Sequence, residues 1–283
     1  MGKIATGWKI TKQSFEVIKH DKEILIYPIL ATISIIVVIG ILTVLSFLGI
    51  LGVTLISSNL SYFSALVLLA IITICAYFIS VFFQAAIVTS ATIRFSGRNP
   101  TLADGLRGPS KRIFSLFGWA AISALVGTIL AALKRSGSNR SKTVAIGSQI
   151  GAGLLGTAWN LITFFTIPII LFEKYGPIQS IKHSTHLFKK TWGENVTAQF
   201  SIGAIFFLIS LPFIVLMILA IMSKNISFII ASAIILVIAI IMIMVVSTSV
   251  NGILKAALYQ YAKTGKMPKV YDNHTIEKMF VKR

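Results

Sequence analysis

The feature that most constrains this chain is a stretch from Ile24 to Ile93 that contains no Asp, Glu, Lys or Arg. Further stretches without these residues cover 113–133, 143–172, 195–223 and 225–254. A helix needs roughly 20 apolar residues to cross the hydrocarbon core of a bilayer, so the first stretch has room for two crossings and each of the others for one. The pattern predicts an all-α polytopic membrane protein with six transmembrane helices.

The composition of the chain agrees with this class and argues against a soluble one. The 283 residues are 56% hydrophobic and 12% charged, whereas soluble domains carry about 25% charged residues. The formal net charge of +18 raises the question of nucleic acid binding. The Lys and Arg residues lie in short segments between the apolar stretches rather than on a soluble domain, so we expect no nucleic acid partner.

The distribution of positive charge predicts the orientation in the membrane, because Lys and Arg near span ends collect on the cytoplasmic side. With the N-terminus inside, the cytoplasmic segments hold 21 of the 26 Lys and Arg residues and the outer loops hold five. We therefore expect both termini to be cytoplasmic. Four of the five outer charges lie in one loop, between Lys134 and Lys142, and the charge rule does not explain them.

Amphipathic segments precede the first, third and fifth predicted spans and are expected to form helices at the membrane interface. In the shortest of them, Thr101 and Asp104 have the spacing of an N-capping pair, and Leu102 and Leu106 share a face. The two longer segments each place apolar residues on one side of the helix. These residues are Ile4, Trp8, Phe15 and Ile18 in the first segment, and Ile178, Ile181, Phe188 and Trp192 in the last.

The even-numbered spans end alike, with a glycine followed by a proline. Gly97, Gly176 and Gly265 are each expected to supply a left-handed stop. Together with the amphipathic segments, these stops divide the single membrane domain into possible units at 1–100, 101–177 and 178–268, followed by a basic cytoplasmic tail at 269–283. Three parallel helix-hairpin repeats would explain the pattern. A coincidence dictated by membrane topology explains it equally well, so both interpretations stay open.

Two stretches carry a resemblance to a known family. The first has Gly7-Trp8, Ser14-Phe15-Glu16-Val17-Ile18 and Asp21-Lys22-Glu23-Ile24-Leu25 before Pro28. The second, more specific one has Ala158-Trp159, Thr163-Phe164, Ile167-Pro168, Glu173, Gly176-Pro177 and Ser184. They resemble an uncharacterised prokaryotic family of multi-pass membrane proteins, classed as a domain of unknown function. The resemblance covers nearly the whole chain and implies a protein of the prokaryotic inner, or plasma, membrane. It transfers no catalytic residue.

A search for catalytic or metal-binding patterns gives none that we assign. All eight acidic residues lie outside the apolar stretches, whereas proton-coupled transporters and intramembrane proteases usually keep ionisable groups within them. His183 and His186 are spaced three apart, as a metal pair could be, but no third ligand is near in sequence. A solvated or headgroup-facing pair is the favoured interpretation. We therefore predict no catalytic residue, no metal site and no cofactor.

Amides are the informative polar groups inside the predicted spans. Gln84, Asn160 and Asn251 lie in the second, fourth and sixth spans, at similar distances before the glycines that end them. If the units surround an axis, the three amides would form a polar site within the membrane. Ordinary hydrogen bonding between helices is the favoured alternative. A glycine series in the fourth span indicates close helix approach there, with a flexible entry segment as the less favoured alternative. Its members are Gly147, Gly151, Gly153 and Gly156.

Lys and Arg residues at a membrane surface ordinarily meet anionic lipid. The candidate lipid contacts are Lys9, Lys12, Arg98, Arg107, Lys111, Arg112, Lys182, Lys189 and Lys190. Three function hypotheses follow. The first is a non-enzymatic accessory or scaffold component that binds anionic lipid and a membrane protein partner. The second is a transporter or channel-like protein with a polar site in the spans. The third, a membrane enzyme, has the least support because the acids and histidines are peripheral.

Overall fold

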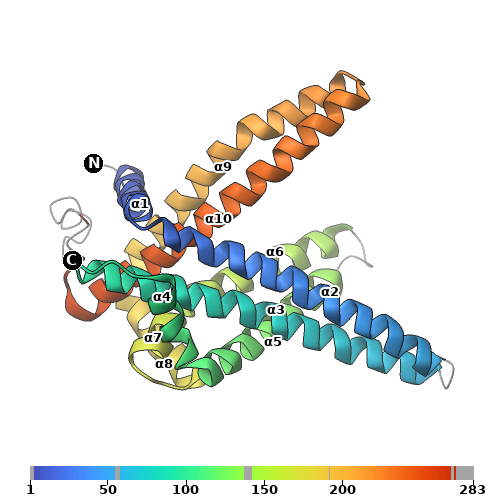
Figure 1. Cartoon of the computed structure of the whole chain (residues 1–283), viewed down its shortest axis with the longest axis horizontal. Helices are drawn as coiled ribbons and strands as arrows, with labels where there is room; N and C mark the ends of the chain where they lie inside the picture. Colours follow the sequence, from blue (N-terminus) through green and yellow to red (C-terminus); the bar gives the residue numbers. More distant parts are fainter. Residues whose placement is uncertain (1–2, 55–57, 137–141, 191, 269–270, 272–283) are drawn as a thin grey trace. The chain divides into compact units, whose positions relative to one another are not determined.

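The computed structural model describes residues 3–54, 58–136, 142–190, 192–268 and 271 (Figure 1). Within these residues all regular structure is helical and no strand occurs. The elements are α1 (Lys3–His20), η1 (Lys22–Leu25), α2 (Ile26–Thr54), α3 (Ser58–Phe95), α4 (Leu102–Ser110), α5 (Ile113–Ser136), α6 (Lys142–Ile162), α7 (Thr166–Phe172), α8 (Pro177–Lys190), α9 (Trp192–Met222) and α10 (Ile226–Thr264).

Six helical segments are long and apolar enough to cross a membrane, as the charge-free stretches predicted. They are Lys22–Phe47, Ser64–Phe95, Ile113–Arg135, Ile146–Phe172, Ile202–Met222 and Ile226–Thr264. The fold is therefore that of an all-α polytopic membrane protein, and this prediction is confirmed.

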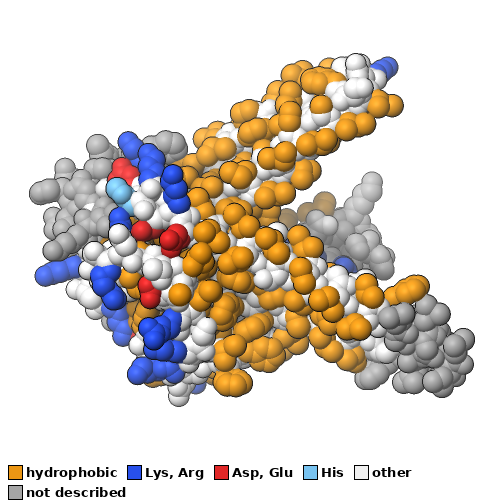
Figure 2. All heavy atoms as spheres, viewed as in Figure 1, with side chains coloured by type: hydrophobic (Ala, Val, Ile, Leu, Met, Phe, Trp, Pro, Cys, Tyr) orange, Lys and Arg blue, Asp and Glu red, His pale blue; other side chains and the backbone are white. Residues whose placement is uncertain are grey.

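Large apolar side chains point outward along these segments. On α9 and α10, Figure 2 shows hydrophobic side chains over most of the visible surface. Leu208 and Ile218 on α9, and Ile234 and Val237 on α10, are each more than half exposed. A soluble monomer rarely exposes a contiguous apolar surface of this extent. Helices whose outer faces are apolar suit a bilayer, because lipid tails replace water around them.

The chain forms two compact units, each built from separate parts of the sequence. The first unit comprises Met1–Pro28, Ile87–Gly105 and Lys189–Arg283, and the second comprises Ile29–Ala86 and Leu106–Phe188. In the first unit α1 packs against α9 and α10, which also pack against each other. In the second unit α5 packs against α6 and α7. The three possible sequence repeats are not tested by this division and stay a prediction.

The fourth span is not one continuous helix. The α6 helix ends at Ile162, a turn covers Thr163–Phe165, and α7 begins at Thr166. The sequence analysis treated 143–172 as a single crossing and did not predict this interruption. A hydroxyl from α8 bonds to two of the backbone groups that the turn frees.

Two of the three expected glycine stops are confirmed. Gly97 has φ 84° and Gly265 has φ 71°, and the Gly265 N–H donates to the Tyr261 carbonyl oxygen over 2.8 Å. The prediction for Gly176 is wrong, because Lys174 takes the left-handed conformation there, with φ 64°. That helix ends at Phe172, before it reaches the glycine.

The expected capping pair at the start of α4 is confirmed. The Thr101 hydroxyl donates to Asp104 Oδ2 over 2.7 Å and accepts a bond from the Asp104 N–H over 3.2 Å. The Thr101 N–H also donates to Asp104 Oδ2 over 3.1 Å. These reciprocal bonds satisfy donors that a helix start leaves unpaired.

The glycines of the fourth span do not all meet a neighbouring helix. A Cβ at Gly156 would lie 3.5 Å from Leu130 Cδ1 of α5, in ordinary contact. At Gly147, Gly151 and Gly153, nothing described lies within 4 Å of the Cβ position. The expected close approach is therefore present at Gly156 and is absent, within the described residues, at the other three.

Candidate functional site

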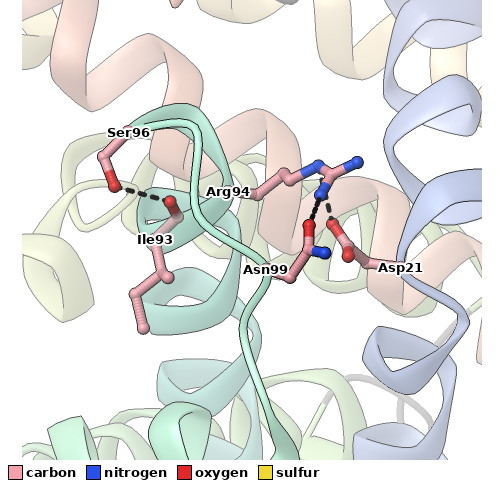
Figure 3. A network of polar contacts seen from close by, with 5 residues as sticks. All are labelled: Asp21, Ile93, Arg94, Ser96 and Asn99. Atoms are coloured by element: carbon pink, nitrogen blue, oxygen red, sulfur yellow. Dashed lines mark hydrogen bonds and ion pairs between the residues drawn. The ribbon is translucent and has the colours of Figure 1, made fainter.

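A polar network around the buried Asp21 lies in the first unit, where the turn after α1 meets the end of α3 (Figure 3). Asp21 is 8% exposed, and its Oδ2 lies 3.1 Å from Nε of Arg94. Nη1 of Arg94 donates a second bond, to Oδ1 of Asn99 in the loop after α3. Ser96 closes the end of α3 through a bond from its hydroxyl to the Ile93 carbonyl oxygen over 2.6 Å. The network joins α1 to the end of the second span.

Burial raises the pKa of Asp21 above its ordinary value, because a buried carboxylate loses hydration. The positive charges of Arg94 and His20 lower this pKa, and the negative charge of Glu23 raises it further. Desolvation is the largest of these effects. The buried surroundings of Asp21 therefore favour the neutral carboxylic acid, and the charge of Arg94 opposes this effect. Loss of Arg94 would favour protonation of Asp21 more strongly.

Two tyrosines make further polar contacts within the first unit. The Tyr27 hydroxyl lies 2.8 Å from the Ser90 hydroxyl and donates to the Leu102 carbonyl oxygen over 3.3 Å. Tyr271 is 1% exposed, and its hydroxyl lies 2.9 Å from the Ser14 hydroxyl on α1. Burial raises the pKa of Tyr271, so this phenol stays protonated at neutral pH.

The interrupted fourth span is the polar feature of the second unit. Ser184 on α8 is fully buried, and its hydroxyl donates to the Ile162 carbonyl oxygen over 2.7 Å. The same hydroxyl oxygen accepts a bond from the Phe165 N–H over 3.0 Å. One side chain thus pairs a carbonyl and an amide on both sides of the turn, which a membrane environment requires.

Two further hydroxyl groups are relevant to this turn. One follows the turn directly in sequence, and the other lies on α8. Thr166 begins α7, and Ser180 lies one helical turn before Ser184. Both residues are fully buried, and neither hydroxyl oxygen has a hydrogen-bond partner among the described residues. Thr163 Oγ1 donates to the Trp159 carbonyl oxygen over 2.6 Å. The turn therefore gathers several hydroxyl groups where a continuous apolar helix was expected.

His183 lies beside an acid and an aromatic ring of the second unit. Its Nδ1 is 4.0 Å from Oε2 of Glu173, and its ring centroid is 4.5 Å from that of Tyr175. His186 is exposed on the same helix. Within the described part of the chain, no group of three His, Cys, Asp or Glu side chains is placed to hold a metal ion.

The three predicted amides do not all belong to the same unit. Gln84 and Asn160 belong to the second unit and Asn251 to the first. Gln84 and Asn251 are half-buried, whereas Asn160 is exposed. The Asn251 Nδ2 donates to the Ser247 carbonyl oxygen, one turn earlier in its own helix, over 2.8 Å. The shared polar site stays a prediction.

Most of the predicted lipid-contacting cations are exposed, although Arg112 is half-buried. The side chains of Lys9 and Lys190 lie outside the described residues, as do those of Trp8 and Trp192. The exposed cations are Lys12, Arg98, Arg107, Lys111, Lys182 and Lys189.

Sequence reasoning missed the two polar clusters for different reasons. Asp21 and Arg94 are far apart in the chain, and neither stands out among other charges at span ends. Ser184 entered the sequence analysis only as one of the residues that carry the resemblance to an uncharacterised family. The sequence signal for the cluster at the turn was the segment Thr163 to Thr166, because it places two hydroxyl groups near the end of an apolar span.

The fold and these sites define an α-helical polytopic membrane protein with buried polar contacts at the ends of its spans. The chain belongs to DUF6159, a family of unknown function whose model matches residues 60–269. This agrees with the resemblance to an uncharacterised family. Neither the curated proteins nor the solved structures include a match to the chain.

Proposed function

We propose that this protein is a non-enzymatic accessory or scaffold component of a prokaryotic plasma membrane, with a basic cytoplasmic face that binds anionic lipid headgroups. The observation that carries the proposal is the division of α1 and α8 into a buried face and an exposed basic face. On α1, Val17 and Ile18 are buried, while Lys12, Glu16 and Lys19 are exposed, which gives the exposed face a net positive charge.

The same division occurs on α8, where Ser180, Ser184, Leu187 and Phe188 are buried. Lys182 and Lys189 on this helix are exposed. A helix held by one face against its own protein, with lysines on the other, can place several ammonium groups at the headgroups. Each such group contributes about 1 kcal/mol to the attraction of anionic lipid.

Replacement of Lys182 and Lys189 by Gln tests the proposal. We expect phosphatidylglycerol to raise the thermal unfolding temperature of the purified wild-type protein more than phosphatidylcholine does. Two lysines account for roughly 2 kcal/mol, so the double variant needs well over tenfold more phosphatidylglycerol for the same stabilisation. The matched control is Lys134→Gln with Arg135→Gln, which removes two exposed charges from the end of α5. An equal lipid response in both double variants would refute the proposal.

The interrupted fourth span favours one second candidate, a transporter or channel-like protein. Broken helices within membrane domains often line binding sites for ions or small substrates. For this candidate, Gln84, Asn160 and Asn251 would supply the polar site. Replacing one amide by Leu would then abolish uptake of a solute into proteoliposomes while the unfolding temperature stays close to that of the wild type. A change in stability alone would support ordinary helix packing. An enzymatic role remains the third hypothesis, without an assigned catalytic group.

A further inference from the structure

The α6 helix exposes a polar stripe within the fourth span. Gln149, Gly153, Thr157 and Asn160 are spaced by four, four and three residues, which places them on one side of a helix. All four are exposed. The Thr157 hydroxyl donates to the Gly153 carbonyl oxygen over 2.9 Å, within the helix. The two amides can donate and accept bonds with a neighbouring helix, and the Thr157 hydroxyl oxygen can still accept one.

The side of α6 next to this stripe packs against α5, since Gly156 lies only about 20° from Gln149 around the helix. The rings of Trp119 and Trp159 stack with their centroids 5.9 Å apart, and Gly156 lies against Leu130. By contrast, no described atom lies within 4 Å of a Cβ built at Gly153. The polar stripe is therefore beside the contact with α5 and is not used by it.

An exposed amide is costly within a membrane because hydrocarbon offers no hydrogen bonds. Residues of this kind usually pair with polar groups on another helix, and small residues let the two backbones approach. The stripe has both properties, since Gly153 lies between Gln149 and Thr157. It therefore suits a transmembrane helix that carries an amide or hydroxyl group of its own.

The positive charge at the end of α5 indicates further what chemistry the partner helix should have. Lys134 and Arg135 are exposed at the end of α5, near the start of α6 in sequence. A second copy of this chain would bring like charges together at this end. A partner with acidic residues there would instead meet opposite charges, which also accounts for a basic loop that the charge rule leaves unexplained.

We propose that the polar stripe of α6 docks a transmembrane helix of another protein, with an amide or hydroxyl within its span and acidic residues at the end facing Lys134 and Arg135. This proposal rests on the proposed function of the protein as an accessory or scaffold component. It specifies the chemical groups that the partner helix carries. The partner helix lies along Gln149, Gly153, Thr157 and Asn160. Its acids contact the basic end of the hairpin.

The test uses a synthetic transmembrane peptide of Leu and Ala, with one central Asn and Glu residues at one end, in phosphatidylcholine vesicles with the full-length protein. A photo-crosslinking residue replaces Thr157. We expect a crosslink to the peptide, and about tenfold less of it when Gly153→Leu blocks the stripe. Gly151→Leu is the matched control, because Gly151 is equally open but lies about 160° away around the helix.

Changes in the peptide keep the test independent of protein folding. Replacing the Asn of the peptide by Leu, or its Glu residues by Gln, should lower the crosslink while the protein carries no change besides the photo-crosslinking residue at Thr157. The double variant Lys134→Gln with Arg135→Gln should lose the dependence on salt. Equal yields with Gly151→Leu and Gly153→Leu, or crosslinks only within one chain or between two copies, would overturn the proposal. A retained stabilisation of the same protein by phosphatidylglycerol, measured separately in vesicles that contain this lipid, would show that the lipid-binding proposal survives that failure.

Discussion

At the scale of single residues, the close approach of α4 to Tyr27 depends on a glycine. A Cβ at Gly105 would overlap the Tyr27 hydroxyl and crowd the Ser90 hydroxyl, both of which are already joined by a hydrogen bond. The overlap involves a fully buried ring rather than a flexible chain end. Relief therefore requires movement of α4 or loss of the Tyr27–Ser90 bond.

Gly105→Ala is expected to destabilise the protein by about 1–3 kcal/mol, the usual range for an overpacked site. Thermal unfolding in detergent measures the effect. Gly40→Ala is the control, because nothing described lies within 4 Å of its Cβ position and Ala favours a helix. Equal unfolding temperatures for the two variants would contradict the packing described around Tyr27.

Asp21 gives the first unit a predictable response to pH. Because its pKa is raised in the folded protein, its contribution to stability is present in full below the unfolded pKa, near 4, and is lost as pH rises through the folded pKa. The unfolding temperature of the wild type should therefore contain a component that falls with rising pH. Asp21→Asn should lack that component. The same pH profile for both proteins would contradict the burial of this carboxyl group.

At the scale of the helical elements, Ser184 stabilises the turn between α6 and α7. Ser184→Ala leaves the Ile162 carbonyl and the Phe165 N–H without this partner, and we expect a loss of roughly 1–3 kcal/mol. Faster hydrogen exchange at 162–166 would locate the effect. Thr185→Ala is the control on the same helix, because the Thr185 hydroxyl bonds only to the Ile181 carbonyl oxygen among the bonds described. Equal exchange rates in the two variants would count against a stabilising role for Ser184.

The helical elements also show which features of the fold can be predicted from the sequence. The six spans follow from long uncharged stretches, because the cost of burying charge in hydrocarbon is a local property of the chain. The Thr101–Asp104 cap and the stops at Gly97 and Gly265 are local as well. The interruption near Thr163 was not predicted in this way, since the hydroxyl that bonds to its freed backbone groups comes from a separate helix.

The polar contacts between distant segments were harder to predict for the same reason. Asp21 meets Arg94 and Ser14 meets Tyr271 only after the helices have packed. Charge and hydrogen-bonding capacity can be read from each residue, but the choice of partner depends on tertiary structure. The amides Gln84, Asn160 and Asn251 were selected by depth alone, and depth does not determine which side of a helix a residue occupies.

At the scale of the whole molecule, the account requires six crossings that place the basic helices on one side of the membrane. Accessibility of single cysteines tests this most directly, in a background where Cys75, the only cysteine, is replaced by Ala. Suitable exposed positions are Arg107, Lys182 and Lys266 on the expected cytoplasmic side, and Lys134 and Lys224 on the other.

The measurement is labelling of intact cells with a membrane-impermeant maleimide, compared with labelling after the membrane is opened. The account predicts that cysteines at Lys134 and Lys224 react in intact cells, whereas those at Arg107, Lys182 and Lys266 react only in opened membranes. Reaction of Lys134→Cys and Lys182→Cys from the same side would contradict the six-span arrangement.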